Sequence, residues 1–369
     1  MFYYLFEYLD KTLNVPGAGV FQYITFRAFA ATITSLGIAA IWGKSVIYRL
    51  QRLQIGEEIR DLGLEGQMQK KGTPTMGGFI ILLSLIIPTV LFAKITNVYI
   101  VLLLLSAVWL GAVGFLDDYI KVFKKNKEGL SGKFKIVGQI GLGLIVGLTM
   151  YYNEHIKVRV YSKLTMLADG TQVQSYTDSK SLMTTVPFLK NNQFDYNMLL
   201  PSFIPDHYVW VVYVLVVIFI ITAVSNGANI TDGLDGLAAG IVAISGSAFF
   251  AFAYLLAVVY GFNRAGAPSL ITAITIGVCL GFLPHNSHPA RIFMGDSGSM
   301  FLGLMLAASA ITLTGQVDPN AISEEKLGPA LLPLLLPFAV LAIPLADLTL
   351  AIIRRIGAGK SPFSSDKEH

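Results

Sequence analysis

The sequence predicts an all-α polytopic integral membrane protein, and its composition is the first observation that does so. Of its 369 residues, 54% are hydrophobic and only 14% are charged, whereas soluble domains carry about 25% charged residues. The second observation is a series of apolar runs close to the roughly 20 residues that a membrane-spanning helix needs. These runs lack the polar face of a soluble helix. We therefore expect the lipid bilayer as a partner, and no nucleic acid.

The apolar runs define the membrane spans in chain order. We predict spans at residues 19–42, 74–93, 98–116, 134–152, 207–224, 237–260, 268–284, 299–314 and 328–353. All nine belong to a single membrane-embedded domain over residues 1–369. The N-terminal stretch has no basic segment and no small-residue cleavage site, so we expect no cleavable signal peptide. The single cysteine, Cys279, excludes a disulfide framework within the chain.

The distribution of basic residues predicts which loops face the cytoplasm. The loop 43–73 contains six Lys or Arg residues and the loop 117–133 contains five. Because positive loops stay on the cytoplasmic side, both are expected there. Nine alternating spans then place the N-terminus outside and the C-terminus inside.

One sizeable excursion, residues 153–206, falls on the external side of this topology. The stretch VRVYSKL alternates apolar and polar residues, and Asp169–Gly170 follows before TQVQSY. Alternation around an Asp-Gly pair predicts a small external β-hairpin.

Three acidic motifs fall on the predicted cytoplasmic side. They are GFLDD at 114–118, SNGANITDGLDGLAAG at 225–240 and HNSHPARIFMGDSGS at 285–299. Asp117 and Asp118 are adjacent like charges, which a cation would stabilise. The alternative, a pair merely solvated at the membrane interface, stays open.

The acidic motifs offer carboxylate oxygens as possible metal ligands. Asp232 and Asp235 share one face if a helix begins near Thr231. Asp296 lies in the small, flexible stretch MGDSGS. Carboxylates suit Mg²⁺ or Mn²⁺, and no Cys/His grouping suggests zinc.

Further candidates are basic or imidazole groups beside these motifs. In KKGTPTMGGF, Lys70 and Lys71 precede Pro74 at the start of a span, and helix N-termini bind phosphate. The segment is not a Walker A loop, and a plain capped helix start is the alternative. His285 and Arg291 are candidate phosphate contacts. Together these features favour a phosphorylated cytosolic substrate that meets a lipid, because phosphoryl transfer depends on positioning and charge neutralisation.

Three of these motifs, KKGTPTMGG, GFLDD and NGANITDGLDGLAAG, carry a resemblance to a known family. The chain resembles the polyprenyl-phosphate N-acetylhexosamine-1-phosphate transferases. Within that superfamily, residues 1–242 are similar to the phospho-N-acetylmuramoyl-pentapeptide transferase branch. The resemblance implies a bacterial inner-membrane enzyme with usually ten spans, a cytoplasmic active site and a homodimeric state. It would place the chain in peptidoglycan synthesis, and so in cell-wall biogenesis, cell shape and cell division.

The reaction that the resemblance implies requires Mg²⁺. Phospho-MurNAc-pentapeptide passes from UDP-MurNAc-pentapeptide to undecaprenyl phosphate, and UMP leaves. Matched by position, the implied catalytic and metal-binding residues are Asp117, Asp118 and Asp235. The implied substrate-binding residues are Lys70, Thr75, Asn226, Asn229 and Asp232, to which our own reading of the residues adds His285, Arg291 and Asp296.

The C-terminal third departs from this pattern. Residues 281–303 and 344–369 resemble the branch that transfers GlcNAc-1-phosphate, whose H-x-H-H loop follows a GKSPF-like stretch. We therefore predict a hybrid chain joined near residues 240–255, without the histidine loop and last span of its relatives. GlcNAc-1-phosphate transfer from UDP-GlcNAc is the alternative reaction. An ion-coupled transporter and an inactive fragment are the alternatives outside this enzyme class.

Overall fold

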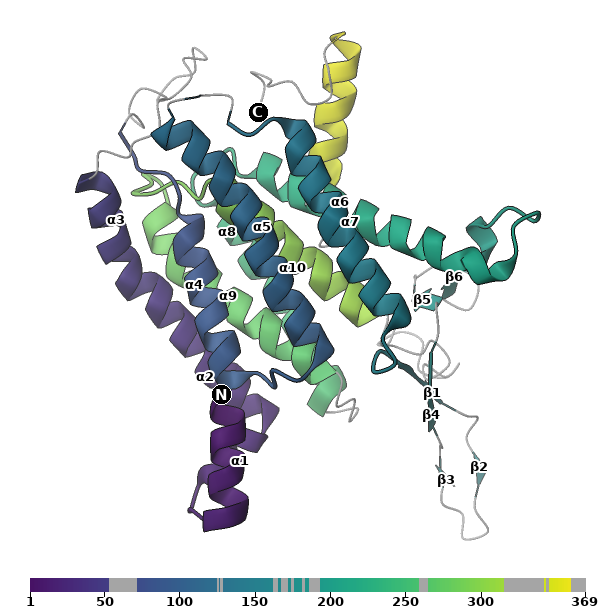
Figure 1. The fold of residues 1–369 in the computed structure, drawn as a ribbon. Helices are drawn as coiled ribbons and strands as arrows, with labels where there is room; N and C mark the ends of the chain where they lie inside the picture. The colour runs from purple at the N-terminus through teal and green to yellow at the C-terminus, as the bar shows by residue number, and fades with distance from the viewer. Residues whose placement is uncertain are drawn as a thin grey trace.

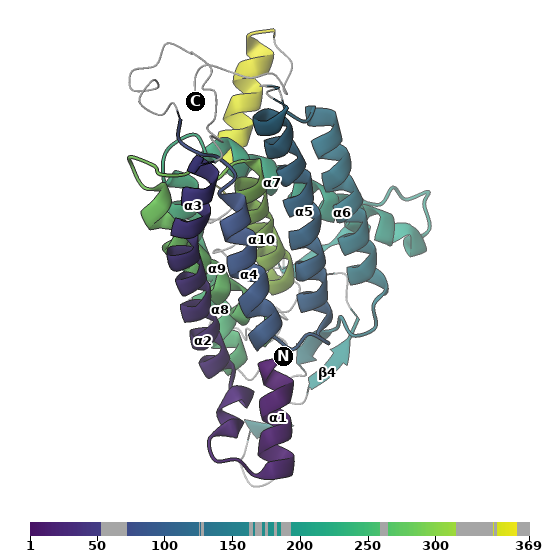
Figure 2. The same cartoon turned by 60° about the vertical axis from the view of Figure 1, so that its left-hand side comes forward.

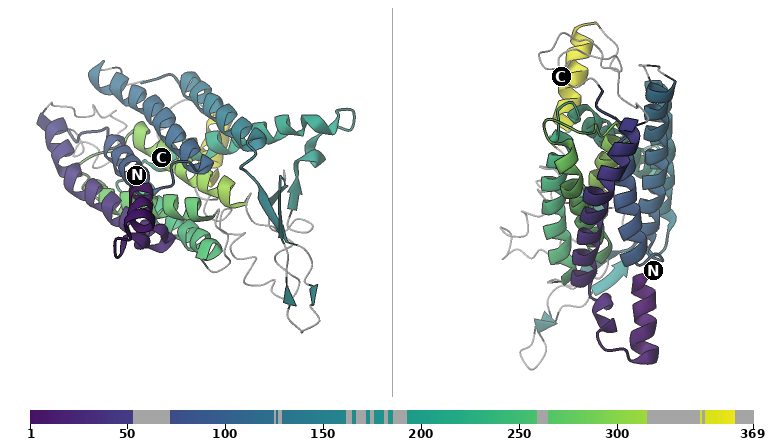
Figure 3. Two further views of the ribbon diagram at one scale, coloured as in Figure 1. Left: turned by 60° about the horizontal axis from the view of Figure 1, so that its bottom comes forward. Right: turned by 90° about the vertical axis from the view of Figure 1, so that its left-hand side faces the viewer.

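The computed structural model describes most of the chain. The described residues are 1–52, 72–124, 126, 129–161, 165–166, 172–173, 176–180, 183–185, 193–258, 265–314, 342 and 345–359. They form a bundle of α-helices from which a β-rich segment projects (Figures 1 and 3). Lys70, Lys71 and most of the predicted span 328–353 lie outside the described residues.

The helices follow the apolar runs of the sequence. Their bounds are α1 Phe2–Leu13, α2 Ile24–Gly37, α3 Gly43–Arg52, α4 Gly78–Phe92, α5 Val98–Phe123, α6 Gly132–Tyr152, α7 Val209–Thr231, α8 Leu237–Val258, α9 Gly266–Asn286 and α10 Asp296–Thr314. A π-helical turn, Ile38–Trp42, joins α2 to α3. Short 3₁₀ helices lie at Ala18–Gln22, Tyr196–Leu199 and Asp206–Tyr208. Residues 345–357 are also helical.

Within the described residues, seven helices are long and apolar enough to cross a membrane. This confirms the predicted all-α polytopic class. The helix α4 has 15 residues, which is shorter than the roughly 20 that span a bilayer. The number of spans and the sides of the termini stay predictions.

The helix α5 extends further than the sequence suggested. We expected its span to end at Leu116, but the helix continues to Phe123 and includes Asp117 and Asp118. The two carboxylates are compatible with a buried helical position because other parts of the chain bind them, as described below. Charge at a span edge was therefore a poor marker of the helix end.

The excursion after α6 contains the predicted hairpin in an elaborated form. The strands are β1 Val158–Tyr161, β2 Thr165–Met166, β3 Gln172–Val173, β4 Tyr176–Ser179, β5 Met183–Thr185 and β6 Gln193–Asp195. The antiparallel pairs β1–β4 and β2–β3 are nested, which confirms a hairpin between Val158 and Ser179, whereas the predicted turn residues Asp169 and Gly170 lie outside the described residues. A second antiparallel pair, β5–β6, follows.

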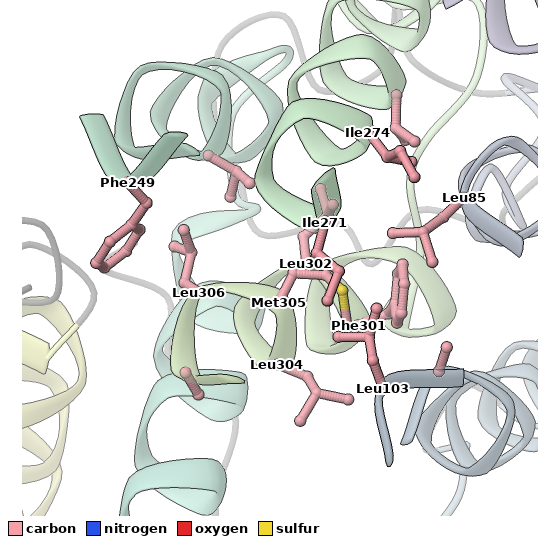
Figure 4. Close-up of a cluster of buried hydrophobic side chains, with 14 of the residues drawn as sticks. Leu85, Leu103, Phe249, Ile271, Ile274, Phe301, Leu302, Leu304, Met305 and Leu306 are labelled. Carbon is pink, nitrogen blue, oxygen red and sulfur yellow. The ribbon is translucent and has the colours of Figure 1, made fainter. Parts of the chain in front are cut away.

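The helix α10 occupies the centre of the bundle. Of its apolar stretch, 83% is buried, compared with 22% for α6. Its side chains Phe301, Leu302 and Met305 pack against residues of α5, α8 and α9 in one apolar core (Figures 2 and 4). The ends of α10 are therefore fixed by the surrounding helices.

Glycines allow α7 to approach its neighbours closely. A Cβ on Gly143 of α6 would lie 2.7 Å from Cγ1 of Ile218 and 2.8 Å from its Cα. A Cβ on Gly303 of α10 would lie 2.8 Å from Cα of Ser225. Small residues at helix interfaces are the usual means of close packing in membranes.

We predict that Gly143→Ala lowers the thermal unfolding temperature of the protein in detergent. The new methyl group meets the backbone of α7, and overpacking of this kind costs about 1–3 kcal/mol. Gly240→Ala on α8 is the matched control, because a Cβ there has nothing within 4 Å. Equal unfolding temperatures for the two variants would contradict the observed packing of α6 on α7.

Candidate active site

The three acidic motifs and the GTPTMGG segment meet at one end of the bundle, the upper end in Figures 1 and 2. The amide of Phe293 donates to the carbonyl of Pro74 at 2.8 Å, and the amide of Gly78 donates to the carbonyl of Met294 at 2.8 Å. The amide of Gly236 donates to Oδ1 of Asn286 at 3.1 Å. Hydrogen bonds thus join the loops that carry these motifs at this end of the bundle. The β-rich segment lies at the other end.

Asp118 on α5 caps the N-terminus of α10. Its Oδ1 accepts from the amide of Asp296 at 3.1 Å, and its Oδ2 accepts from the amide and hydroxyl of Ser297 at 3.2 and 2.6 Å. A carboxylate here satisfies orphan amides and complements the helix dipole. The residue is 1% exposed. Asp118 is therefore held in place by three donors.

Glycine at position 295 makes this cap sterically possible. Gly295 has a φ of +73°, and a Cβ there would lie 2.6 Å from Oδ2 of Asp118. On α5, Gly114 faces the backbone of Ser297 so closely that a Cβ would clash. Both glycines allow the first turn of α10 to lie directly against α5.

Asp117 and Asp296 share two lysines. Asp117 is fully buried, and its two oxygens lie 2.6 Å from Nζ of Lys121 and 2.9 Å from Nζ of Lys135. Nζ of Lys121 also lies 3.2 Å from Oδ1 of Asp296, and Nζ of Lys135 pairs with Oδ2 of Asp296. The amide of Leu130 donates to Oδ1 of Asp117 at 2.7 Å. We call Asp117, Asp118, Asp296, Lys121 and Lys135 the charged cluster.

The charged cluster has the donor chemistry of a divalent metal site. One oxygen from each of Asp117, Asp118 and Asp296 lies within 4.8 Å of the others. Three carboxylates against two ammonium groups leave one net negative charge in a buried place. Hard oxygen donors with an excess negative charge fit Mg²⁺ or Mn²⁺. The residues present therefore fit the cation that the sequence implied, which Asp117 and Asp296 would hold beside Asp118.

Asp235, the implied metal ligand, lies elsewhere among the described residues. Its Oδ2 is 3.1 Å from Nδ1 of His288 and accepts from the amide of Ala290 at 3.3 Å. The structure thus groups Asp296, rather than Asp235, with Asp117 and Asp118. The role of Asp235 stays a prediction. Sequence reasoning also missed Lys121 and Lys135, although the four-residue spacing of Asp117 and Lys121 was a usable signal.

The predicted binders on and after α7 lie in different surroundings. The amide of Asn226 donates to Oε1 of Gln139 on α6 at 2.8 Å, within the bundle. Asn229 is half-buried one turn later, and Asp232 is the C-cap residue directly after α7. Thr75 is 5% exposed, beside the loop contacts of Pro74. Lys70 lies outside the described residues. Their substrate-binding roles stay predictions.

His285 and Arg291 differ in exposure. His285 is 3% exposed, and its Nε2 lies 3.1 Å from the carbonyl of Ala40 in the π-helical turn. A Cβ on Gly43 would lie 2.9 Å from the same nitrogen. These contacts pack His285 of α9 against the π-helical turn and the first residue of α3. Arg291 is exposed and remains available to an anion.

Comparison with known proteins identifies the family of the chain. The model of the glycosyl transferase family 4 matches residues 99–314. This range contains all members of the charged cluster. The chain belongs to glycosyl transferase family 4.

Curated members of this family show the branch to which the chain is similar. A phospho-N-acetylmuramoyl-pentapeptide-transferase of Flavobacterium psychrophilum is 52% identical over 85% of this chain and 80% of its own length. The protein of the same name from Parabacteroides distasonis is 51% identical over 85% of this chain and 77% of its own length. The one from Flavobacterium johnsoniae is 49% identical over 86% of this chain and 81% of its own length. The match to the Flavobacterium psychrophilum protein covers 85% of the 369 residues, so it must extend beyond residue 255, the end of the predicted join. The hybrid character stays a prediction.

We predict that Asp296→Asn weakens Mn²⁺ binding to this family member at least about tenfold, since it removes one of three clustered carboxylates. Electron paramagnetic resonance of free Mn²⁺ in a titration of purified protein measures this directly. Asp235→Asn is the discriminating comparison, because Asp235 pairs with His288 outside the cluster. If Asp235→Asn abolished Mn²⁺ binding while Asp296→Asn bound Mn²⁺ fully, Asp235 would be the metal ligand, as the sequence implied.

Proposed function

We propose that the chain transfers phospho-MurNAc-pentapeptide from UDP-MurNAc-pentapeptide to undecaprenyl phosphate and releases UMP. The observation that carries the proposal is the charged cluster, in which two buried carboxylates, Asp117 and Asp118, meet the partly exposed Lys121, Lys135 and Asp296 at one end of a helical bundle. The 52% identical relative named for this transfer supports the choice of sugar. The product would be the first lipid intermediate of peptidoglycan synthesis.

The proposal includes a location and a partner. The relatives are bacterial proteins, so we place the chain in the bacterial inner membrane with the charged cluster on the cytoplasmic side. The basic stretches 43–73 and 117–133 support this side. The polyprenyl chain of the acceptor would lie in the bilayer and its phosphate at the membrane surface. A homodimer is part of the proposal and rests on the resemblance alone.

The transfer makes and breaks one phosphorus–oxygen bond. An oxygen of the lipid phosphate attacks the β-phosphorus of the donor, and the bond from that phosphorus to the oxygen bridging to the α-phosphate breaks. The electron pair stays with the departing UMP. Bound Mg²⁺ would supply charge neutralisation for the pyrophosphate.

The residues of the cluster contribute in different ways. Lys121 and Lys135 place positive charge where phosphate oxygens accumulate negative charge. Asp118 is engaged by three donors of α10, so its main work is to fix the first turn of that helix. Asp117 and Asp296 lie between the lysines. They are the carboxylates that remain to orient a cation or the attacking phosphate.

We predict that the purified protein releases UMP from UDP-MurNAc-pentapeptide in the presence of undecaprenyl phosphate and Mg²⁺. Lys135→Met should lower the rate at least about 100-fold, since a half-buried ammonium placed at the reacting phosphates contributes on the scale of an oxyanion donor. Lys133→Met is the matched control, because Lys133 lies two residues earlier on α6 and is exposed.

UDP-GlcNAc serves as the competing donor in the same assay. Release from UDP-GlcNAc alone would replace the proposed sugar by the one that the C-terminal third suggested. Release from neither donor would contradict the proposed activity. Substrate uptake into vesicles without UMP release would favour a transporter.

A further inference from the structure

A buried polar contact joins α6 to α7 one helical turn from the charged cluster, on the side of the bundle interior. Nε2 of Gln139 donates to Oγ of Ser225 at 3.0 Å, and Nδ2 of Asn226 donates to Oε1 of Gln139 at 2.8 Å. Gln139 and Ser225 are both fully buried. We call these three residues the Gln139 clasp. Neither the proposed reaction nor the sequence motifs assign a role to Gln139.

The clasp lies on the same face of α6 as a member of the charged cluster. Lys135, Gln139, Gly143 and Gly147 follow one another at four-residue spacing, which aligns them along one side of a helix. Gly143 and Gly147 pack on Ile218 and Val214 of α7. Gln139 is one turn, about 6 Å, from Lys135 along the axis. Any rotation of α6 at Gln139 therefore also moves Lys135.

The apolar contacts of α6 do not by themselves fix this rotation. Glycine against isoleucine or valine permits close approach but has no directional bond. Only 22% of the apolar stretch of α6 is buried, so much of the helix surface is not held by protein neighbours. The two amide groups of the clasp, by contrast, pair in one relative orientation. An unpaired amide at this depth is costly, so the paired orientation is strongly favoured.

Lys135 depends on the correct rotation because its two partners belong to other helices. Its Nζ pairs with Asp117 on α5 and with Asp296 on α10. The side chain of Lys135 is 17% exposed in this arrangement. A lysine released from these partners would extend into water, since its long stem carries a strongly hydrated charge.

We propose that Gln139 is a positioning residue that holds Lys135 between Asp117 and Asp296. Gln139 acts through the rotation of α6 and touches no substrate. Asn226, which the sequence suggested as a substrate binder, serves the same purpose, because its amide on α7 donates to Oε1 of Gln139 on α6. The catalytic consequence rests on the proposed function, whereas the position of Lys135 does not.

The first test measures the position of Lys135 without any substrate. Purified protein is acetylated with an N-hydroxysuccinimide ester, and mass spectrometry gives the rate at Lys135 relative to exposed Lys133. Gln139→Met, which keeps the volume but removes both bonds, should raise this ratio several-fold. Thr149→Val is the matched control, because that hydroxyl donates within α6 to the carbonyl of Ile145. An unchanged ratio in Gln139→Met would overturn the proposal.

The second test asks whether Gln139 and Lys135 act as one unit in turnover. At a temperature where Gln139→Met and Thr149→Val are both fully folded, Gln139→Met should lower kcat about 10- to 100-fold and Thr149→Val should not. The double variant with Lys135→Met should be no slower than Lys135→Met alone. Losses that multiply, or a loss that follows the unfolding temperature, would show a structural role instead. Ser225→Ala, which removes one bond of the clasp, should give a smaller change of the same kind.

The two tests separate the inference from the proposed function. If the wild type releases no UMP but Gln139→Met still exposes Lys135, the proposed reaction fails and the positioning role stands. If UMP is released but Lys135 reacts equally in both proteins, the reverse holds.

Discussion

The carboxylate of Asp118 accepts three hydrogen bonds from the first residues of α10, and the site depends on this contact. A buried carboxylate is tolerated only where donors or cations compensate it. The helix N-terminus supplies them through its unpaired amides and its dipole. Because α10 is the central and most buried helix, the same contact transmits the rigidity of the core to Asp296. Gly114 and Gly295 are the residues without which α5 and α10 could not approach so closely.

Charge compensation determines the rest of the site. Once Asp118 has brought α10 against α5, Asp117 and Asp296 face one another as like charges. Lys121 and Lys135 then lie between them and offset this repulsion. One net negative charge remains, which attracts a divalent cation, and a bound cation would turn the net charge positive. A site of that sign accommodates the phosphates of two anionic substrates at once.

Local sequence signals predicted the elements well, whereas contacts between distant segments were not readable. Apolar runs located the helices because a bilayer requires that length, and the alternating stretches on either side of the Asp-Gly pair predicted the antiparallel pairs β1–β4 and β2–β3. The meeting of Asp118 with Asp296 joins positions 178 residues apart, and no local pattern encodes it. The resemblance implied Asn226 as a substrate binder, but no local pattern showed that it would bond to Gln139, which is 87 residues away. His285 was predicted as a phosphate contact, and its observed partner, the carbonyl of Ala40 in the π-helical turn, is 245 residues away.

The site unites a rigid and a less constrained component. Asp296 and Asp118 belong to helices embedded in the core, whereas Lys135 comes from α6, which is largely exposed to the surroundings. Electrostatic stabilisation of a reacting phosphate depends on groups that are oriented before the reaction. An exposed helix can provide such a group only if a directional contact near the site fixes its rotation. In α6 one such contact is the Gln139 amide, one turn from the lysine, whose burial makes the paired state favourable. Another is the hydrogen bond that the indole of Trp109 on α5 donates to the carbonyl of Gly138 at 2.9 Å. The placement of Gln139 inside a membrane span, where polar residues are costly, is therefore understandable as a requirement of the site rather than of the fold.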